Sequence, residues 1–143
     1  MKFKISNSAL FLLLFFAGIG FNSNSVKAQS NEPYVLVEQM PEFAGGEEKM
    51  YQFISSNINY PAYCKENNIV GRVIARFIVT NKGEIDSVNI LASPHQTMSD
   101  ECIRMIKLMP IWTPGKQNGK PVNVFFTLPI SFQLETSTPK KRK

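Results

Sequence analysis

The chain has 143 residues and carries 16 Lys and Arg against 11 Asp and Glu, so its formal net charge is +5 at pH 7. Three basic residues lie among the first 27 residues and four in the terminal KKRK, which leaves nine against all 11 acidic residues in between. A nucleic-acid-binding domain carries its basic residues on the fold itself, so this balance excludes that class. The length suits one small domain with one core.

The first 28 residues have the pattern of an export signal. Two lysines precede an almost wholly apolar run at 9–21, and Val26 and Ala28 occupy the small-residue positions of a signal-peptidase site. The apolar run is shorter than the about 20 residues that a membrane-spanning helix needs. We therefore predict a cleaved signal peptide over 1–28, with an uncleaved membrane anchor as the alternative.

Two helices are predicted in the N-terminal half, after a flexible lead-in over 29–36. The short apolar run at 34–40 is consistent with either a strand or an extended segment. Apolar residues then recur at helical spacing over 47–57, which predicts an amphipathic helix. Pro61 suits the first position of a second, short helix that ends near Glu66.

Three strands are predicted from a period of two. Apolar residues alternate from Gly71, a hairpin turn follows at Gly83, and the returning strand ends near Pro94. A tight reversal at 118–119 leads into the last strand, where apolar residues alternate without interruption over 122–134.

A third helix is expected between the second and third strands. Thr97 or Ser99 could cap it, with Asp100 and Glu101 in its first turn, and Pro110 would end it. The order of elements predicts an α+β fold, in which two to three helices pack on one face of a three-stranded antiparallel sheet.

The two cysteines, Cys64 and Cys102, allow one intramolecular pairing. Export makes a disulfide chemically feasible, and both residues fall on predicted helices that could share one layer. We therefore favour the bond. The alternative is that both are small buried hydrophobic residues without a bond.

No enzyme, metal or cofactor site is indicated. The single histidine, His95, has no Cys, Asp or Glu at ligand spacing, and it alone would have to serve any catalytic nucleophile. Residues 136–143 are predicted to be a disordered basic tail, with at most weak attraction to anionic lipid headgroups.

Pro129 lies inside the most regular strand. Proline has no N–H to donate, so it is tolerated only at a bulge or where its backbone points away from a partner strand. If Pro129 faces outward, the last strand is an edge strand, and backbone groups are free along Asn123, Val124, Phe125, Phe126 and Thr127. Such an edge is either blunted by the proline against aggregation or open to an added peptide strand.

The sequence resembles the TonB C-terminal domain family of Gram-negative bacteria over Val37 to Leu134. The resemblance depends on NYPAYCKENNIVGRVIARFIVTNKGEIDSVNIL and MPIWTPGKQNGKPVNVFFTLPISFQL, with VEQMPEFAGGEE similar to an N-terminal extension of one subgroup. It implies a domain over 37–135. The motif residues to which we assign structural roles are Tyr60, Pro61, Gly71, Trp112, Pro114, Gly115 and Pro129.

The resemblance implies a receptor for the TonB box, a short periplasmic segment of outer-membrane transporters that adds to the last strand. The residues carried over for this contact are Asn57, which stands where the family's familiar residue is Gln, and the edge 123–127. We expect a periplasmic binding module without a cofactor. The alternatives are a self-associating structural domain that forms a homodimer and a short energy transducer anchored in the inner membrane.

Overall fold

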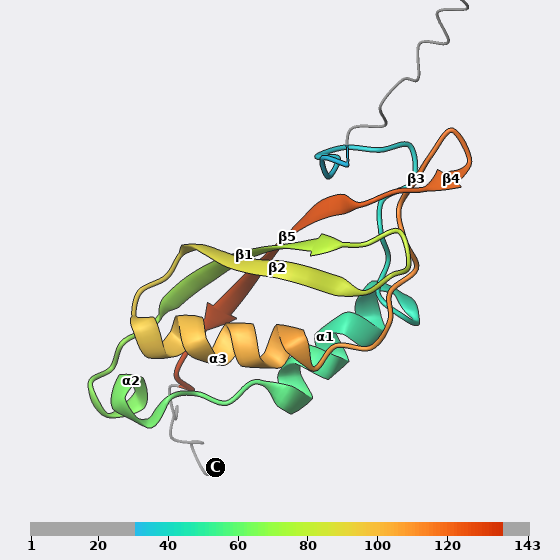
Figure 1. Ribbon diagram of the computed structural model, residues 1–143. Coiled ribbons are helices and arrows are strands. Elements are labelled where there is room, and N and C mark those ends of the chain that lie inside the picture. Colours follow the sequence, from blue (N-terminus) through green and yellow to red (C-terminus); the bar gives the residue numbers. More distant parts are fainter. Residues whose placement is uncertain (1–30, 136–143) are drawn as a thin grey trace, which may run out of the picture. The chain divides into compact units, whose positions relative to one another are not determined.

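Three antiparallel strands form the sheet at the centre of the fold (Figure 1). The computed structural model describes residues 31–135, so the predicted signal peptide and basic tail lie outside the described residues. β1 (Gly71–Val79) lies between β2 (Ile85–Ala92) and β5 (Val124–Phe132), and both pairings are antiparallel. The predicted α+β class is confirmed.

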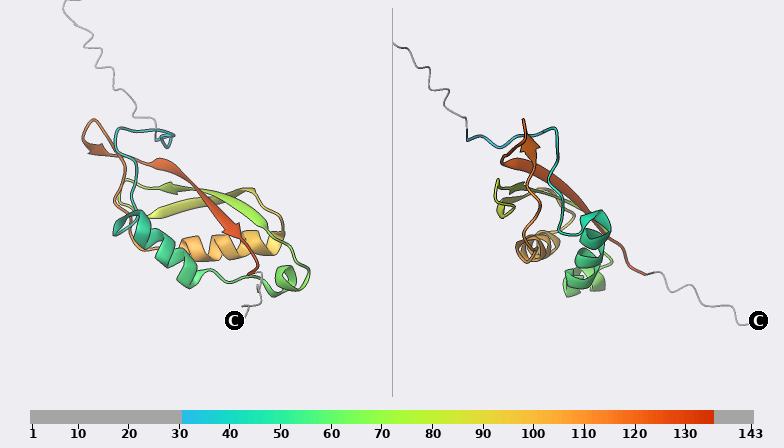
Figure 2. Two further views of the ribbon diagram at one scale, coloured as in Figure 1. Left: turned by 180° about the vertical axis from the view of Figure 1, so that it is seen from behind. Right: turned by 90° about the vertical axis from the view of Figure 1, so that its right-hand side faces the viewer.

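Helices cover one face of the sheet, as Figure 2 shows. α1 spans Gly46–Asn57 and α2 spans Ala62–Glu66, close to the predicted bounds, and α3 spans Gln96–Lys107. Pro61 immediately precedes α2. Within residues 31–135, no helix combines the length and the apolar character that crossing a membrane requires.

The core fills the space between the helices and one face of the sheet. Alternate side chains of β1 and β5 are buried there, namely Val73, Ala75, Phe77, Val79, Val124, Leu128, Ile130 and Phe132. This alternation confirms the period-two prediction, although β5 ends at Phe132, before the predicted end at residue 134. The whole core lies in the unit Asn31–Lys143, which we therefore expect to fold by itself.

The reversal at 118–119 closes a small separate hairpin of β3 (Lys116–Gln117) and β4 (Lys120–Pro121). Asn118 and Gly119 have φ values of 51° and 73°, as a two-residue hairpin turn with positive φ at both positions requires. The N-terminal extended segment runs beside this hairpin. Its Gln39 exchanges two backbone hydrogen bonds with Lys116, of 3.1 and 2.8 Å.

Trp112 closes the core at one end of the sheet. Its side chain is 2% exposed and makes edge contacts with Phe43, Phe77 and Phe126, at centroid distances of 5.5, 5.6 and 4.9 Å. The backbone N–H of Trp112 donates to the carbonyl of Gly83 over 2.8 Å, which joins the tryptophan segment to the hairpin between β1 and β2. The predicted packing role of Trp112 is confirmed.

Other motif residues also have structural surroundings. The Tyr60 hydroxyl donates to the carbonyl of Ile69, and its ring meets Phe132 edge-on at 5.5 Å. A Cβ at Gly115 would lie 2.7 Å from Val124 Cγ2, so only glycine fits beside the start of β5. Pro114 is half-buried next to it.

The predicted start of α3 is wrong. His95 caps the helix, because its Nδ1 accepts from the backbone N–H of Thr97 at 3.2 Å. The helix therefore begins before Thr97 and Ser99, and no acidic residue falls in its first turn. Glu101 lies a turn later and instead accepts from the side chain of Arg104.

The predicted disulfide is also wrong. Cys64 and Cys102 are both fully buried and free. The sulfur of Cys64 lies 3.2 Å from Thr97 Oγ1, at the start of α3, whereas Cys102 is five residues further along that helix. Five residues correspond to about 7.5 Å along a helix axis, so the two thiols face different levels of the same layer. They pack as small hydrophobic side chains.

Candidate functional site

The outer edge of β5 is the first component of the candidate site. β5 pairs with β1 over its whole length, and within residues 31–135 no strand lies on its other side. The N–H of Phe125 points outward, because it donates to a group outside the sheet. Since outward and inward backbone groups alternate, Thr127, Pro129 and Ser131 also face outward, while Leu128 and Ile130 bond to β1. The prediction that Pro129 lies on an edge and faces outward is confirmed.

The predicted open stretch is wrong at its beginning. The Tyr34 N–H donates to the carbonyl of Asn123, and the Phe125 N–H donates to the carbonyl of Tyr34, each over 2.8 Å. Tyr34 falls in the predicted lead-in, and here it forms a parallel bridge to β5. The backbone groups of Val124 and Phe126 point inward to β1, so they are not available to an added strand either.

The open edge therefore lies further along β5 than predicted. Among residues 31–135, no partner outside β1 bonds to the carbonyl of Phe125 or to the backbone of Thr127, Pro129 or Ser131. We call the outward groups from the Phe125 carbonyl to Ser131 the open edge. Thr127 is thus the only predicted edge residue whose N–H and carbonyl both belong to it.

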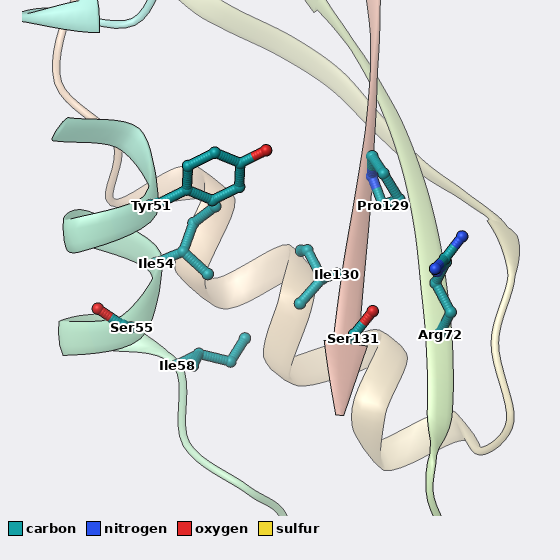
Figure 3. A pocket seen from close by; sticks show the side chains of 8 residues that line it. All are labelled: Tyr51, Ile54, Ser55, Ile58, Arg72, Pro129, Ile130 and Ser131. Atoms are coloured by element: carbon teal, nitrogen blue, oxygen red, sulfur yellow. The ribbon is translucent and has the colours of Figure 1, made fainter. Parts of the chain in front are cut away.

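A groove of about 630 Å3 lies beside the second half of the open edge (Figure 3). We call it the α1–β5 groove. One wall comes from Tyr51, Ile54 and Ser55 of α1 and from its C-cap residue, Ile58. The other side consists of Pro129, Ile130 and Ser131 on β5, together with Arg72 on β1. In Figure 3, Ile54 and Ile58 point from the helix toward β5, and Ile130 points back toward them.

The groove is mainly apolar, with the hydroxyls of Tyr51, Ser55 and Ser131 and one cation, Arg72, in its lining. Arg72 is exposed, and among residues 31–135 no carboxylate forms an ion pair with it. The second arginine on this face of β1, Arg76, lies over the ring of Phe125 at 4.9 Å. The Tyr51 hydroxyl donates to Glu47 over 3.0 Å, and this hydrogen bond raises the pKa of Tyr51 above its ordinary value.

Asn57 is not part of this groove. Its side-chain amide donates to the carbonyl of Phe53 over 2.8 Å, one turn earlier in α1. Its own carbonyl accepts from Arg104 over 2.6 Å, which ties the end of α1 to α3. The structure therefore gives Asn57 a role at the end of the helix and does not bring it to the open edge.

The sequence-based site omits most of the groove. Ile54 and Ile58 belong to the predicted apolar face of the first helix, but no part in a binding site was predicted for them. Tyr51, Ile54 and Ile58 are spaced at i, i+3 and i+7, which signals a second stripe beside the core. The outward orientation of Pro129 also implies an outward Ser131, although the predicted peptide-binding residues end at Thr127.

The described residues show no alternative chemistry at the site. Between residues 31 and 135, no three His, Cys, Asp or Glu side chains lie close enough together to hold a metal ion. The groove-lining residues include neither a histidine nor a cysteine. What the arrangement offers is hydrogen-bonding backbone, an apolar cleft and a guanidinium.

Comparison with known proteins identifies the family. The family model described as Gram-negative bacterial TonB protein C-terminal matches residues 56–134, which is more than half of the chain. The chain therefore belongs to this family.

Two solved structures illustrate what the chain is similar to. The solution structure of a TonB C-terminal domain from Pseudomonas aeruginosa is 28% identical, with a TM-score of 0.46, over 55% of this chain and 79% of that one. The corresponding domain from Helicobacter pylori is 22% identical, with a TM-score of 0.47, over 62% of this chain and 92% of that one. No curated protein matches the chain.

Proposed function

We propose that this protein is a periplasmic TonB-like binding module that captures an extended peptide segment of an outer-membrane transporter. The segment adds to the sheet as a further strand along the open edge of β5. The observation that carries this proposal is the run of outward backbone groups from Phe125 to Ser131 in a chain of the TonB C-terminal family. Strand addition supplies affinity through backbone hydrogen bonds and specificity through alternate side chains.

The open edge has more carbonyl acceptors than N–H donors, which favours a peptide with its backbone N–H groups available. The edge offers carbonyls at Phe125, Thr127, Pro129 and Ser131, but N–H groups only at Thr127 and Ser131. A peptide that lacks N–H groups at the facing positions would leave these carbonyls without new partners. Proline in the paired part of the ligand is therefore expected to weaken binding.

An NMR titration tests the proposal. Labelled residues 31–143 would be titrated with peptides that represent the N-terminal segments of outer-membrane transporters. We expect the largest amide shifts at Thr127 and Ser131, because their N–H groups gain hydrogen bonds. The absence of shifts along the open edge at millimolar peptide would contradict strand addition.

A proline variant gives the sharpest control. Thr127→Pro removes an N–H that makes no hydrogen bond with residues 31–135, so we expect the stability to change little. Binding should weaken by about tenfold, because one ladder hydrogen bond is lost and its acceptor is left unpaired. Thr127→Val keeps the N–H and should bind like the parent chain. Equal binding by the Pro and Val variants would place the peptide elsewhere.

The proposal includes export through removal of residues 1–28. The mass of the protein recovered from the periplasm of the producing bacterium tests this part. Cleavage after Ala28 is the expected result, and an intact N-terminus would favour a membrane-anchored form instead.

A further inference from the structure

We propose that the α1–β5 groove and Arg72 read the side chains of the added strand. A branched aliphatic side chain enters the groove, and an adjacent acidic side chain pairs with Arg72. This inference rests on the proposed function, because it requires a strand at the open edge. It goes further by assigning a chemical class to the ligand's side chains.

The apolar half of the subsite follows from the alternation of side chains. An added strand continues the sheet, so every second side chain points toward the helices, on the same side as Ile130. Beside Ile130 these side chains meet Ile54 and Ile58, which are only half-buried. Tyr51 closes the wall, and its hydroxyl already has a partner in Glu47. The Ser55 hydroxyl on this wall likewise donates to the carbonyl of Gln52 over 3.0 Å, so the wall offers apolar surface and hydroxyls that already have partners.

The preference for an acidic side chain in the ligand follows from the position of Arg72. Arg72 is the register partner of Ser131, so both side chains lie on the sheet face that the helices leave open. Neighbouring strands are about 4.8 Å apart, and the long side chain of Arg72 can extend over the small Ser131 toward an added strand. Arg72 is the only charged residue that lines the groove, so the complementary group is a carboxylate.

These two halves define a short pattern. The ligand residue directly opposite Ser131 shares the face of Arg72 and should be Asp or Glu. Its two neighbours point toward α1 and should be branched and aliphatic.

Segments of this chain do not supply the pattern. A second copy of β5 contains no acidic residue, and the sequence of 136–143 contains four basic residues and no Asp or Glu. We therefore assign the groove to a different protein chain.

A peptide comparison tests the acidic half. The probe is a capped peptide with Thr-Ile-Glu-Ile-Thr at its centre, titrated into residues 31–143 and followed by calorimetry and amide shifts. Replacing the peptide Glu by Gln should weaken binding by about threefold to fivefold at low salt, because an exposed ion pair contributes modestly. Arg72→Gln should abolish this difference. Arg76→Gln removes the same charge from the same sheet face. It should leave the difference between the Glu and Gln peptides unchanged, because Arg76 lies over Phe125.

A groove-filling variant tests the apolar half. Replacing the two flanking Ile residues of the peptide by Ser should weaken binding by about tenfold or more, since each removes buried apolar surface. Ser55→Phe adds a ring to the wall of the groove and should reduce the difference in affinity between the Ile peptide and the Ser peptide. Ser56→Phe, at the next exposed position of α1 and outside the groove lining, is the matched control and should preserve it.

The outcomes separate this inference from the proposed function. Equal affinity for the Glu and Gln peptides, with shifts at Thr127 and Ser131, would overturn the role of Arg72 while strand addition stands. Shifts at the open edge with no penalty for Ser in place of Ile would overturn the apolar subsite. No shifts with any peptide would overturn strand addition itself. Concentration-dependent association in the absence of peptide, blocked by Thr127→Pro, would assign the edge to a second copy and overturn the choice of ligand.

Discussion

Gly83 is the position at which a single methyl group should destabilise the domain most clearly. Its φ is +81°, and a Cβ built there would lie 1.9 Å from the carbonyl oxygen of Trp112. No side-chain rotation relieves that contact, because both groups are fixed to backbone. Gly83→Ala must therefore displace the Trp112 backbone and break the 2.8 Å hydrogen bond from Trp112 to Gly83.

The magnitude can be built from three contributions. A non-glycine residue at positive φ costs about 1 kcal/mol. The lost backbone hydrogen bond costs about another 1 kcal/mol. Displacement of Trp112 from its edge contacts with Phe77 and Phe126 costs about 1 kcal/mol more. We expect the free energy of unfolding to fall by about 3 kcal/mol.

Gly119 provides a matched control within the same chain. Its φ is +73°, but a Cβ there would have no atom within 4 Å. Gly119→Ala should therefore cost only about 1 kcal/mol, from the backbone conformation alone. Urea unfolding followed by the fluorescence of Trp112, the only tryptophan, measures both variants. Equal losses in the two variants would refute the claim that contact with Trp112 constrains Gly83.

Three further outcomes are expected from residues 31–143. His95→Ala should lower the free energy of unfolding by about 1 kcal/mol through loss of the α3 cap, while His95→Asn should retain most of it, as urea titration would show. Cys64 and Cys102 should react with a thiol reagent only after unfolding, since both are buried and burial raises the pKa of Cys102 to about 12; rapid labelling of the native protein would contradict this. The hydrogen bond from Arg104 lowers the pKa of Glu101 in the fold, so its stabilising contribution is complete above the ordinary Glu pKa of about 4.3 and is lost as the pH falls through the lower folded value. Glu101→Gln should therefore flatten the loss of stability with acid, and an unchanged acid profile would contradict that role.

The elements and the phase of β5 were predictable from local chemistry. Apolar periodicity indicated the helices and strands, and the missing N–H of Pro129 fixed which residues of the last strand face outward. The turn at 118–119 followed from the preference of Asn-Gly for positive φ. Each of these inferences depends on neighbouring residues in the sequence, which is why each could be made without coordinates.

The occupied part of the edge could not be predicted in the same way. Tyr34 meets Asn123 and Phe125 because an extended segment with no periodicity of its own runs beside the β3–β4 hairpin. The α1–β5 groove likewise depends on how far α1 packs from β5, which apolar spacing does not determine. The orientation of Cys64 toward Thr97 depends on where α3 begins, and there the histidine cap was missed.

The Tyr34 bridge also sets the length of ligand that the sheet can hold. A strand added to β5 cannot pair beyond the Tyr34 carbonyl without displacing it, and β5 ends at Phe132. The stretch from Phe126 to Phe132 measures about 23 Å in an extended strand. Peptides longer than about 23 Å should gain no further ladder hydrogen bonds, so their affinity should stop rising with length. Tyr34→Pro removes the N–H donated to Asn123 and should therefore increase the length at which the affinity stops rising.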